Sequence, residues 1–370
     1  MASITPRQLR AARLNATSLA PSGRSGSAEL VCRLLAMQGQ DFPSACWGIG
    51  VRSGGTLTDV FSAFDDGSLV RSWPLRGTLH VVAAADLGWM LAITAPRQLR
   101  AARKREADLG LDEAVFESAR ELAVTALSGD TALDRAQFTS ALAEAGIRVD
   151  GQRAYHLIWR LALEGRIVWG PIRGSRQLLV LSAGWLPNVP AVARDEALGR
   201  FLARYLTGHG PASLADFAWW AGLTKSDAAT AHAVLRHRLT PVTCDGEDLW
   251  ALDDARFPAR PASAVRLLPG FDEYLLGYRD RTQVLAPEHA AAVAPGGNGV
   301  FLPMLVSGGE IVGVWRRTVS RAGVSVQLRP FRPLASRELR SAGVASARFA
   351  RFLGLPRIGD LDVVTNVQTH

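Results

Sequence analysis

Apolar residues recur at helical spacing through the middle of the chain, between residues with capping and turn preferences. The stretch 112–127 opens with acidic residues and then places an apolar side chain at every third or fourth position. Two shorter helical patterns follow, and then two runs of strand type joined through Gly174. The helices are predicted over residues 112–127, 134–145 and 152–164, and the strands over 166–172 and 176–182. Three helices followed by a hairpin predict a winged-helix unit.

The same order of elements recurs in the next segment. Ser213 with Asp216, and Thr224 with Asp227, each have the spacing of a capping box that opens a helix. Short runs rich in β-forming residues follow the second of these helices. The elements are predicted over residues 195–207, from Ser213, over 225–238, and as a hairpin of 241–245 with 248–253. This segment predicts another winged-helix unit.

A weaker copy of the pattern precedes both units. Its predicted elements are helices over 27–39 and 57–64, and a hairpin of 69–73 with 78–82 across Pro74–Gly77. One helix from Asp86 and another from Pro96, rich in Arg and Lys, then lead into the next unit. The recognition helix of this copy is not obvious within 41–57, so its boundaries are the least defined of the three. The chain is therefore interpreted as a tandem array of about three related units.

The composition changes after residues 258–261. Alternating strand-like runs with glycine-rich turns follow, and they predict a small antiparallel sheet or barrel. These runs cover residues 264–271, 299–307, 310–317 and 324–331, and a basic helix is predicted over 335–353. The predicted fold class is α+β: tandem winged-helix units with a C-terminal antiparallel β-barrel-like domain. The predicted domains are 1–110, 111–190, 191–258 and 259–370.

The charge balance suggests the class of partner. The chain has 42 Lys and Arg residues against 34 Asp and Glu, a net charge of +8, and its isoelectric point is near 10.2. Lys104 and Lys225 are its two lysines, so the positive charge is almost entirely arginine. An arginine-rich composition also arises from GC-rich codon usage, but guanidinium groups bind phosphates in bidentate fashion. A polyanion such as nucleic acid is the leading partner class.

Other features of the sequence narrow the function further. No apolar run is long enough to span a membrane, and the first thirty residues lack a secretory signal, so a cytoplasmic protein is expected. Three cysteines without metal spacing and seven scattered histidines indicate neither disulfides nor a metal site. No cofactor motif occurs, and no heptad pattern predicts a dimer, so a monomer without a cofactor is expected.

Three local strings contain residues suited to chemistry. They are Gln38-Gly39-Gln40-Asp41, the hairpin string Arg76-Gly77-Thr78-Leu79-His80, and residues 267–274 followed by 278–281. The two glutamines converge only where a helix unwinds, which Gly39 permits. Each string also has a structural interpretation, in which glutamines cap helix ends, Arg-Gly forms a turn, and Asp272 pairs with Arg281.

Taken together and in order, LLAMQGQD, SWPLRGTLH, GPASLADFAWWAGL and LLPGFDEYLLGYRDR resemble the AlkZ/YcaQ-like winged-helix DNA glycosylases. The resemblance covers nearly the whole chain. It implies tandem winged helices on a C-shaped scaffold with a C-terminal β-barrel. The catalytic Gln-x-Gln or Gln-x-Asp motif of that family falls on Gln38 and Gln40, and the second glutamine makes the chain more similar to the AlkZ branch.

The resemblance implies a monofunctional DNA glycosylase that hydrolyses the N-glycosidic bond of N7-alkylated guanine in double-stranded DNA. Bulky antibiotic adducts and interstrand crosslinks are further substrates that it leaves open, which would give roles in DNA repair or self-resistance. The candidate DNA-binding residues are Arg76, Arg279, Arg281, Arg316 and Arg317, and the candidates for active-site support are His80 and Asp272.

Two other functions stay open at this point. A non-enzymatic winged-helix DNA-binding protein or transcription regulator would share the fold and the charge, but it needs a basic recognition helix. The segments 152–164 and 225–238 have apolar centres, which is more typical of scaffold helices. An enzyme acting on a small molecule is the third alternative, and no cofactor motif supports it.

Overall fold

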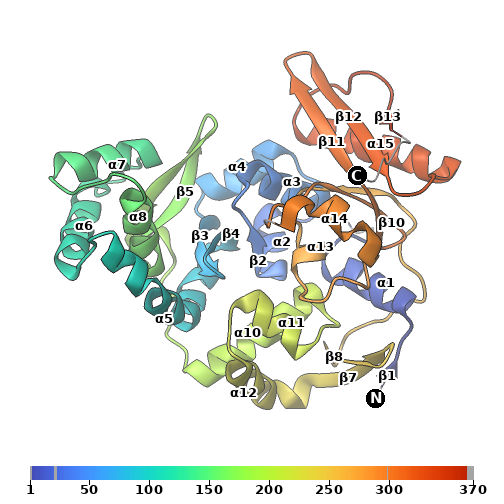
Figure 1. Ribbon diagram of the computed structural model, residues 1–370, viewed down its shortest axis with the longest axis horizontal. Helices are drawn as coiled ribbons and strands as arrows, with labels where there is room; N and C mark the ends of the chain where they lie inside the picture. The colour runs from blue at the N-terminus through green and yellow to red at the C-terminus, as the bar shows by residue number, and fades with distance from the viewer. Residues whose placement is uncertain (1, 21–22, 298, 365–370) are drawn as a thin grey trace. The chain divides into compact units, whose positions relative to one another are not determined.

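A computed structural model describes residues 2–20, 23–297 and 299–364. Groups of helices are followed by strands that pair mainly antiparallel in small sheets, which confirms the predicted α+β class (Figure 1). The residue contacts divide the chain into two compact units: unit 1 is Met1–Val60 with Gly199–His370, and unit 2 is Phe61–Leu198. This division is coarser than the four predicted domains, whose boundaries stay a prediction.

Unit 2 contains an antiparallel sheet with helices packed beside it. Its strands lie in the order β4, β3, β5 and β6, and Arg71 of β3 pairs with Trp169 of β5. Helices α6, α7 and α8 lie beside the β5–β6 hairpin (Figure 1). The elements are β3 (Leu69–Leu75), β4 (Thr78–Ala83), α5 (Ala84–Asp108), α6 (Glu113–Ala126), α7 (Arg135–Glu144), α8 (Arg153–Leu163), β5 (Ile167–Arg173), β6 (Arg176–Leu181) and α9 (Ser182–Trp185). The predicted order of three helices and a hairpin is confirmed here.

Helix α5 differs from the prediction of separate helices from Asp86 and Pro96. It is one helix of 25 residues with Pro96 inside it. Pro96 lies on the exposed face, so the proline ring and the hydrogen bond it removes face solvent rather than the core. The proline signal was therefore wrong as a helix boundary.

Unit 1 begins with helices that pack around a short strand. Its N-terminal elements are β1 (Ala2–Ser3), α1 (Pro6–Ala16), α2 (Ser27–Leu34), β2 (Ala36–Gln38), α3 (Phe42–Ser53) and α4 (Leu57–Asp65), which runs into unit 2. The predicted helix 27–39 is too long, because Leu35 adopts a left-handed φ of 69° that ends α2. The sequence showed no obvious helix within 41–57, but α3 lies there, and Asp41 caps it by accepting from the backbone N–H of Ser44.

The middle of unit 1 follows the predicted capping signals. Ser213 with Asp216 and Thr224 with Asp227 both form capping boxes, at the starts of α11 and α12. The elements are α10 (Arg194–His209, whose first residues belong to unit 2), α11 (Leu214–Ala221), α12 (Lys225–Leu235), β7 (Leu239–Cys244) and β8 (Glu247–Leu252). Strands β1, β7 and β8 form a three-stranded sheet in that order.

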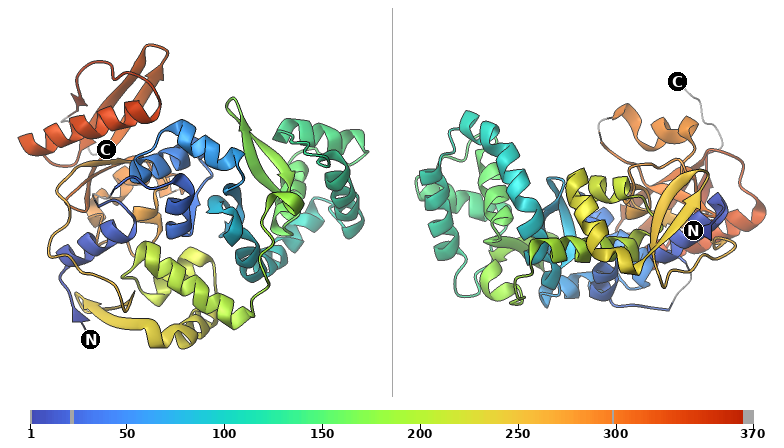
Figure 2. Two further views of the ribbon diagram at one scale, coloured as in Figure 1. Left: turned by 180° about the vertical axis from the view of Figure 1, so that it is seen from behind. Right: turned by 90° about the horizontal axis from the view of Figure 1, so that it is seen from below.

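The C-terminal part of unit 1 is an open sheet covered by a helix. Its strands lie in the order β13, β12, β11, β10 and β9, and α15 packs along one face, with Trp315 against Phe349 (Figure 2). The elements are β9 (Arg266–Leu268), α13 (Glu273–Leu276), α14 (Ala290–Val293), β10 (Met304–Ser307), β11 (Glu310–Ser320), β12 (Gly323–Pro330), α15 (Ser336–Phe352) and β13 (Asp362–Val363), and short 3-10 helices occupy Arg236–Arg238, Pro287–His289 and Pro295–Gly297. The predicted barrel is wrong for the described residues: edge strands β9 and β13 are short and do not pair with each other.

No helix in the described part of the chain combines the length and the apolar content that crossing a membrane requires.

Glu338 links the start of α15 to strand β10 of the sheet on which α15 packs. Its carboxylate accepts from Ser307 Oγ at 2.6 Å, from the backbone N–H of Ala335 at 2.9 Å and from both Nη atoms of Arg332 at 2.7 and 2.9 Å. The hydrogen bonds from Arg332 are the main reason that the pKa of Glu338 is lowered to about 2. The ionised carboxylate therefore holds the start of α15 on β10.

We expect Glu338→Gln to be less stable than the wild type at pH 7, and we expect this gap to shrink in acid. The folded-state pKa is depressed, so the stabilisation is complete above the usual value of 4.5 and is lost as the pH falls towards 2. Urea unfolding of both proteins between pH 7 and pH 3 measures the gap. A gap that is constant over this range would show that the charge of Glu338 contributes nothing.

Candidate active site

The glutamine motif lies at the end of a short buried strand in unit 1. Gln38 is the last residue of β2, and Gln40 is exposed two residues later, just before α3. The backbone N–H of Gln38 donates to Glu273 Oε1 at 2.9 Å. The side-chain Oε1 of Gln38 is buried and accepts no hydrogen bond from any described residue. A buried amide oxygen without a partner is costly, so this atom needs a ligand or a water.

A small pocket adjoins Gln38. Its volume is about 10 Å³, which matches the space that one water molecule occupies. It is lined by Met37, Gln38, Ser44, Ala45, Gly48, Pro269, Gly270, Phe271, Asp272 and Glu273. The structure thus brings the first glutamine together with the 267–274 string, which the sequence places more than 200 residues away.

A buried ion pair holds Asp272, one of the residues that line this pocket. Asp272 accepts from Arg52 Nη1 at 2.8 Å and from Nη2 at 2.7 Å, and both side chains are fully buried. Arg52 also donates to the carbonyl oxygens of Thr17 and Gly48. Asp272 further caps α13 by accepting from the backbone N–H of Tyr274. The expected pairing of Asp272 with Arg281 is wrong, because Arg52 of the unpredicted helix α3 fills that role.

Glu273 is a buried residue that the sequence analysis missed. Its side chain is 1% exposed. Its Oε1 accepts from Gln38 N, and its Oε2 accepts from Trp220 Nε1 at 2.8 Å and lies 3.4 Å from His209 Nε2. The one signal available in the sequence was a glutamate inside an otherwise apolar string, and nothing local indicated its partners.

The four candidate arginines of unit 1 have different surroundings. Arg279 and Arg316 are exposed. The guanidinium of Arg281 lies 4.9 Å from the ring centre of Phe301, and burial lowers the pKa of Arg281. Arg317 lies 5.9 Å from the ring centre of Trp315. Arg279 and Arg316 are thus the more accessible pair for a phosphate.

Arg76 and His80 belong to unit 2, whereas Gln38 belongs to unit 1. Arg76 lies in the turn between β3 and β4 with a left-handed φ of 49°. His80 is fully buried on β4, and its Nδ1 lies 2.8 Å from the carbonyl oxygen of Thr78. Arg76 thus has the turn position predicted for it, and the supporting role of His80 stays a prediction.

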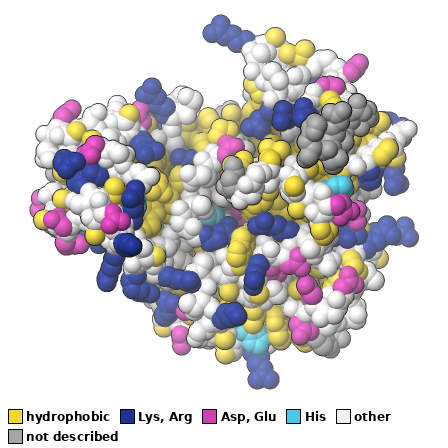
Figure 3. Space-filling view, in the orientation of Figure 1, with side chains coloured by type: hydrophobic (Ala, Val, Ile, Leu, Met, Phe, Trp, Pro, Cys, Tyr) yellow, Lys and Arg dark blue, Asp and Glu magenta, His cyan; other side chains and the backbone are white. Residues whose placement is uncertain are grey.

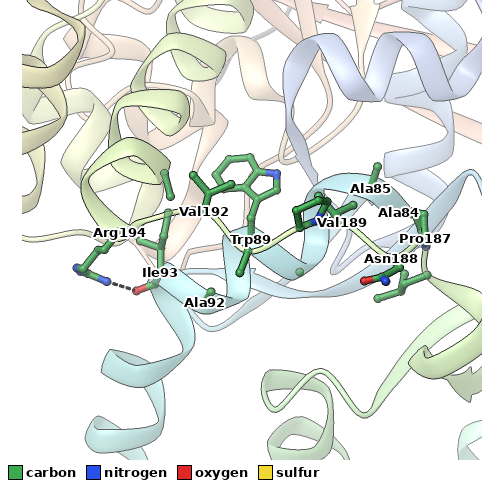
Figure 4. A pocket seen from close by; sticks show the side chains of 15 residues that line it. Ala84, Ala85, Trp89, Ala92, Ile93, Pro187, Asn188, Val189, Val192 and Arg194 are labelled. Atoms are coloured by element: carbon green, nitrogen blue, oxygen red, sulfur yellow. Dashed lines mark hydrogen bonds between the residues drawn. The ribbon is translucent and has the colours of Figure 1, made fainter.

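Unit 2 contains a larger pocket that none of the predicted site residues lines. It has a volume of about 480 Å³ and lies between the first half of α5 and the segment that precedes α10 (Figure 4). Trp89 and Val192 are among its mostly apolar lining residues, and Arg194 donates to the carbonyl oxygen of Ile93 at its rim. Within the described ranges, no group of three or more His, Cys, Asp or Glu residues is placed to hold a metal ion.

Comparison with known proteins gives three similarities that span most of the chain. Residues 31–352 match the family described as DNA glycosylase AlkZ-like. The chain is 28% identical over 385 aligned residues to the interstrand DNA cross-link repair glycosylase of Streptomyces sahachiroi, covering 95% of this chain and 97% of that protein. The solved structure of Streptomyces sahachiroi DNA glycosylase AlkZ is similar with a TM-score of 0.80 and 25% identity, covering 98% of this chain and 99% of that one.

Proposed function

The chain belongs to the DNA glycosylase AlkZ-like family, and from this premise we propose that it hydrolyses the N-glycosidic bond of N7-alkylated guanine in double-stranded DNA. The family match, the curated relative and the solved structure confirm the resemblance found in the sequence. The observation that carries the proposal is the buried Oε1 of Gln38, which has no hydrogen-bond partner among the described residues and belongs to a residue lining a pocket of one-water size.

The substrate explains why an amide suffices at this site. Alkylation at N7 gives guanine a positive charge, so the base leaves as a neutral molecule and takes the bonding electrons with it. The general acid of ordinary glycosidases is then dispensable. Water adds to the anomeric carbon and loses a proton to the solvent, and the sugar becomes an abasic site. The protein needs only to hold and orient this water.

We assign the positioning of this water to the glutamine motif. An amide oxygen accepts a hydrogen bond from water, and Gln38 Oε1 is available for that bond. Gln40 is exposed at the start of the next segment, where its side chain is accessible to a bound nucleic acid. Water held at the correct angle reacts at a much higher effective concentration than bulk water does.

The candidate arginines would hold the DNA backbone. Arg76, Arg279, Arg281, Arg316 and Arg317 stay our proposed phosphate contacts, with Arg279 and Arg316 the most accessible of those in unit 1. Phosphate contacts set the register of the protein on the duplex without reading its sequence. The reaction uses one active site, so we propose that the protein acts on DNA as a monomer.

The same proposal covers bulky adducts and interstrand crosslinks at N7 of guanine as further substrates. The curated relative is named for the repair of interstrand DNA crosslinks. A crosslink through N7 of guanine carries the same positive charge as N7-methylguanine, so the same leaving-group argument applies. We therefore propose antibiotic-type N7 adducts as a second substrate class, in repair or in self-resistance.

The test is base release from duplex DNA containing N7-methylguanine. We expect the protein to produce abasic sites faster than spontaneous depurination, and to leave undamaged guanine in place. Release of undamaged guanine would contradict the proposed dependence on the positive charge. Salt-sensitive DNA binding without release, from this lesion and from a bulky N7 adduct, would favour the non-enzymatic DNA-binding alternative.

A further inference from the structure

We propose that Glu273 is a positioning residue that acts through Gln38, an inference that rests on the proposed function. Glu273 is the buried carboxylate directly behind the glutamine motif, and its Oε1 holds the backbone N–H of Gln38 at 2.9 Å. Its hydrogen bond is to the backbone of Gln38, so it acts on the reaction through Gln38. Its role is to fix the backbone position of Gln38, from which the Gln38 side chain extends.

The chemistry of the site requires a carboxylate at this position. Trp220 Nε1 donates to the second oxygen at 2.8 Å, so two N–H groups from distant segments converge on Glu273. A carboxylate has two acceptor oxygens and satisfies both donors. A glutamine has one acceptor oxygen, so it leaves one N–H facing an NH₂ group. The two donors therefore favour glutamate over glutamine at this site.

Rigid neighbours keep Glu273 in place. Asp272, the preceding residue, is held by the buried Arg52 ion pair. Trp220 and His209 pack with ring centres 5.0 Å apart on the side of Oε2. Gln38 is thus anchored to a part of unit 1 that has little freedom to move.

Glu273→Gln tests this role against a matched control. We expect the single-turnover rate of N7-methylguanine release to fall by about 10-fold to 100-fold, because misplaced catalytic groups lose effective concentration. DNA affinity should stay within about twofold. The control is Tyr274→Phe, which removes a buried hydrogen bond from the adjacent residue but none from Gln38. It should keep the wild-type rate.

The outcomes separate three explanations. A slower rate in Glu273→Gln alone, at a melting temperature no lower than that of Tyr274→Phe, supports the positioning role. An unchanged rate in Glu273→Gln, or equal slowing in both variants, overturns it. Failure of the proposed function is distinct, since the wild type itself would then release no base.

A repeated octapeptide carries a second inference independently. The string Pro-Arg-Gln-Leu-Arg-Ala-Ala-Arg occurs at residues 6–13 and again at 96–103. In the first copy, Arg10 pairs with Glu310 at 2.9 Å, and Arg13 is buried 3.8 Å from the ring centre of Tyr278. The first copy therefore has a structural role inside unit 1.

The second copy has the opposite environment. Arg100, Arg103 and Lys104 on α5 are exposed, and these three side chains make no hydrogen bond or ion pair with any residue that the structure describes. Their spacing places them on one side of the helix. Figure 3 shows Lys and Arg side chains gathered over the part of unit 2 that contains α5. We propose that this basic stripe binds the phosphate backbone of the substrate DNA, which also rests on the proposed function.

The triple variant Arg100→Ala, Arg103→Ala and Lys104→Ala tests the stripe. We expect weaker DNA binding, with a dependence of log Kd on log salt that is smaller by up to about 3, since each lost phosphate contact lowers it by about 1. The control variant replaces Arg337, Arg340 and Arg351 of α15 with alanine, which removes the same charge from exposed positions. It should change the salt dependence much less.

If both triple variants weakened DNA binding equally, the cause would be the loss of overall positive charge, and the proposed role of the basic stripe would be wrong. An unchanged salt dependence in the α5 variant would do the same. Base release measured at saturating DNA tests the proposed function separately, because a lost phosphate contact leaves the chemical step intact.

Discussion

Replacing Gln38 with alanine is expected to lower the single-turnover rate of N7-methylguanine release by about 10²-fold, because water that is no longer held in the correct position loses effective concentration. The alanine removes Oε1, the buried acceptor to which we assign the attacking water. DNA affinity should change little, because Gln38 is half-buried and uncharged. Quantifying abasic sites with enzyme in excess over DNA measures the chemical step alone.

Gln283→Ala is the control for this experiment. Gln283 is a half-buried glutamine of unit 1 that does not line the pocket beside Gln38, and the interaction described for it, with Arg10, uses its backbone carbonyl oxygen. It should release base at the wild-type rate. Wild-type activity in Gln38→Ala would show that the motif of the family does not carry the chemistry in this chain.

Replacing Asp272 with alanine is expected to lower the free energy of unfolding by about 3–5 kcal/mol, because the charge of Arg52 is then buried without its partner. Both side chains have no exposed area, and the two hydrogen bonds between them measure 2.7 and 2.8 Å. Loss of the α13 cap at Tyr274 adds to the effect. Urea unfolding followed by tryptophan fluorescence measures it, since Trp47 and Trp220 lie in the same unit.

Glu310→Ala gives the comparison for this second prediction. Glu310 pairs with Arg10 at 2.9 Å, but its side chain is 53% exposed, so water replaces the lost partner. The loss of stability should be much smaller than for Asp272→Ala. Similar small losses in both variants would mean that the Arg52–Asp272 pair is not the buried support that the structure indicates.

Local elements could be predicted well because their signals lie within a few residues. The capping boxes at Ser213 and Thr224 start their helices as expected, since a cap needs only a side chain and an N–H three residues on. The predicted helices and hairpin of residues 111–190 also match the observed α6, α7, α8, β5 and β6. The prediction failed at Leu35, where an apolar run is equally compatible with a helix and with the buried strand that follows.

The sequence alone determined the α+β class, the order of helices and hairpins, the basic charge and the four strings that together indicated the family. Only the tertiary structure decided which groups meet. Gln38 and Glu273 are 235 positions apart, and Arg52 and Asp272 are 220 apart. Such pairs form when packing brings distant segments into one desolvated place, where an unpaired charge or amide is costly. No local pattern encodes that choice, which is why Glu273 was missed and Asp272 was assigned the wrong partner.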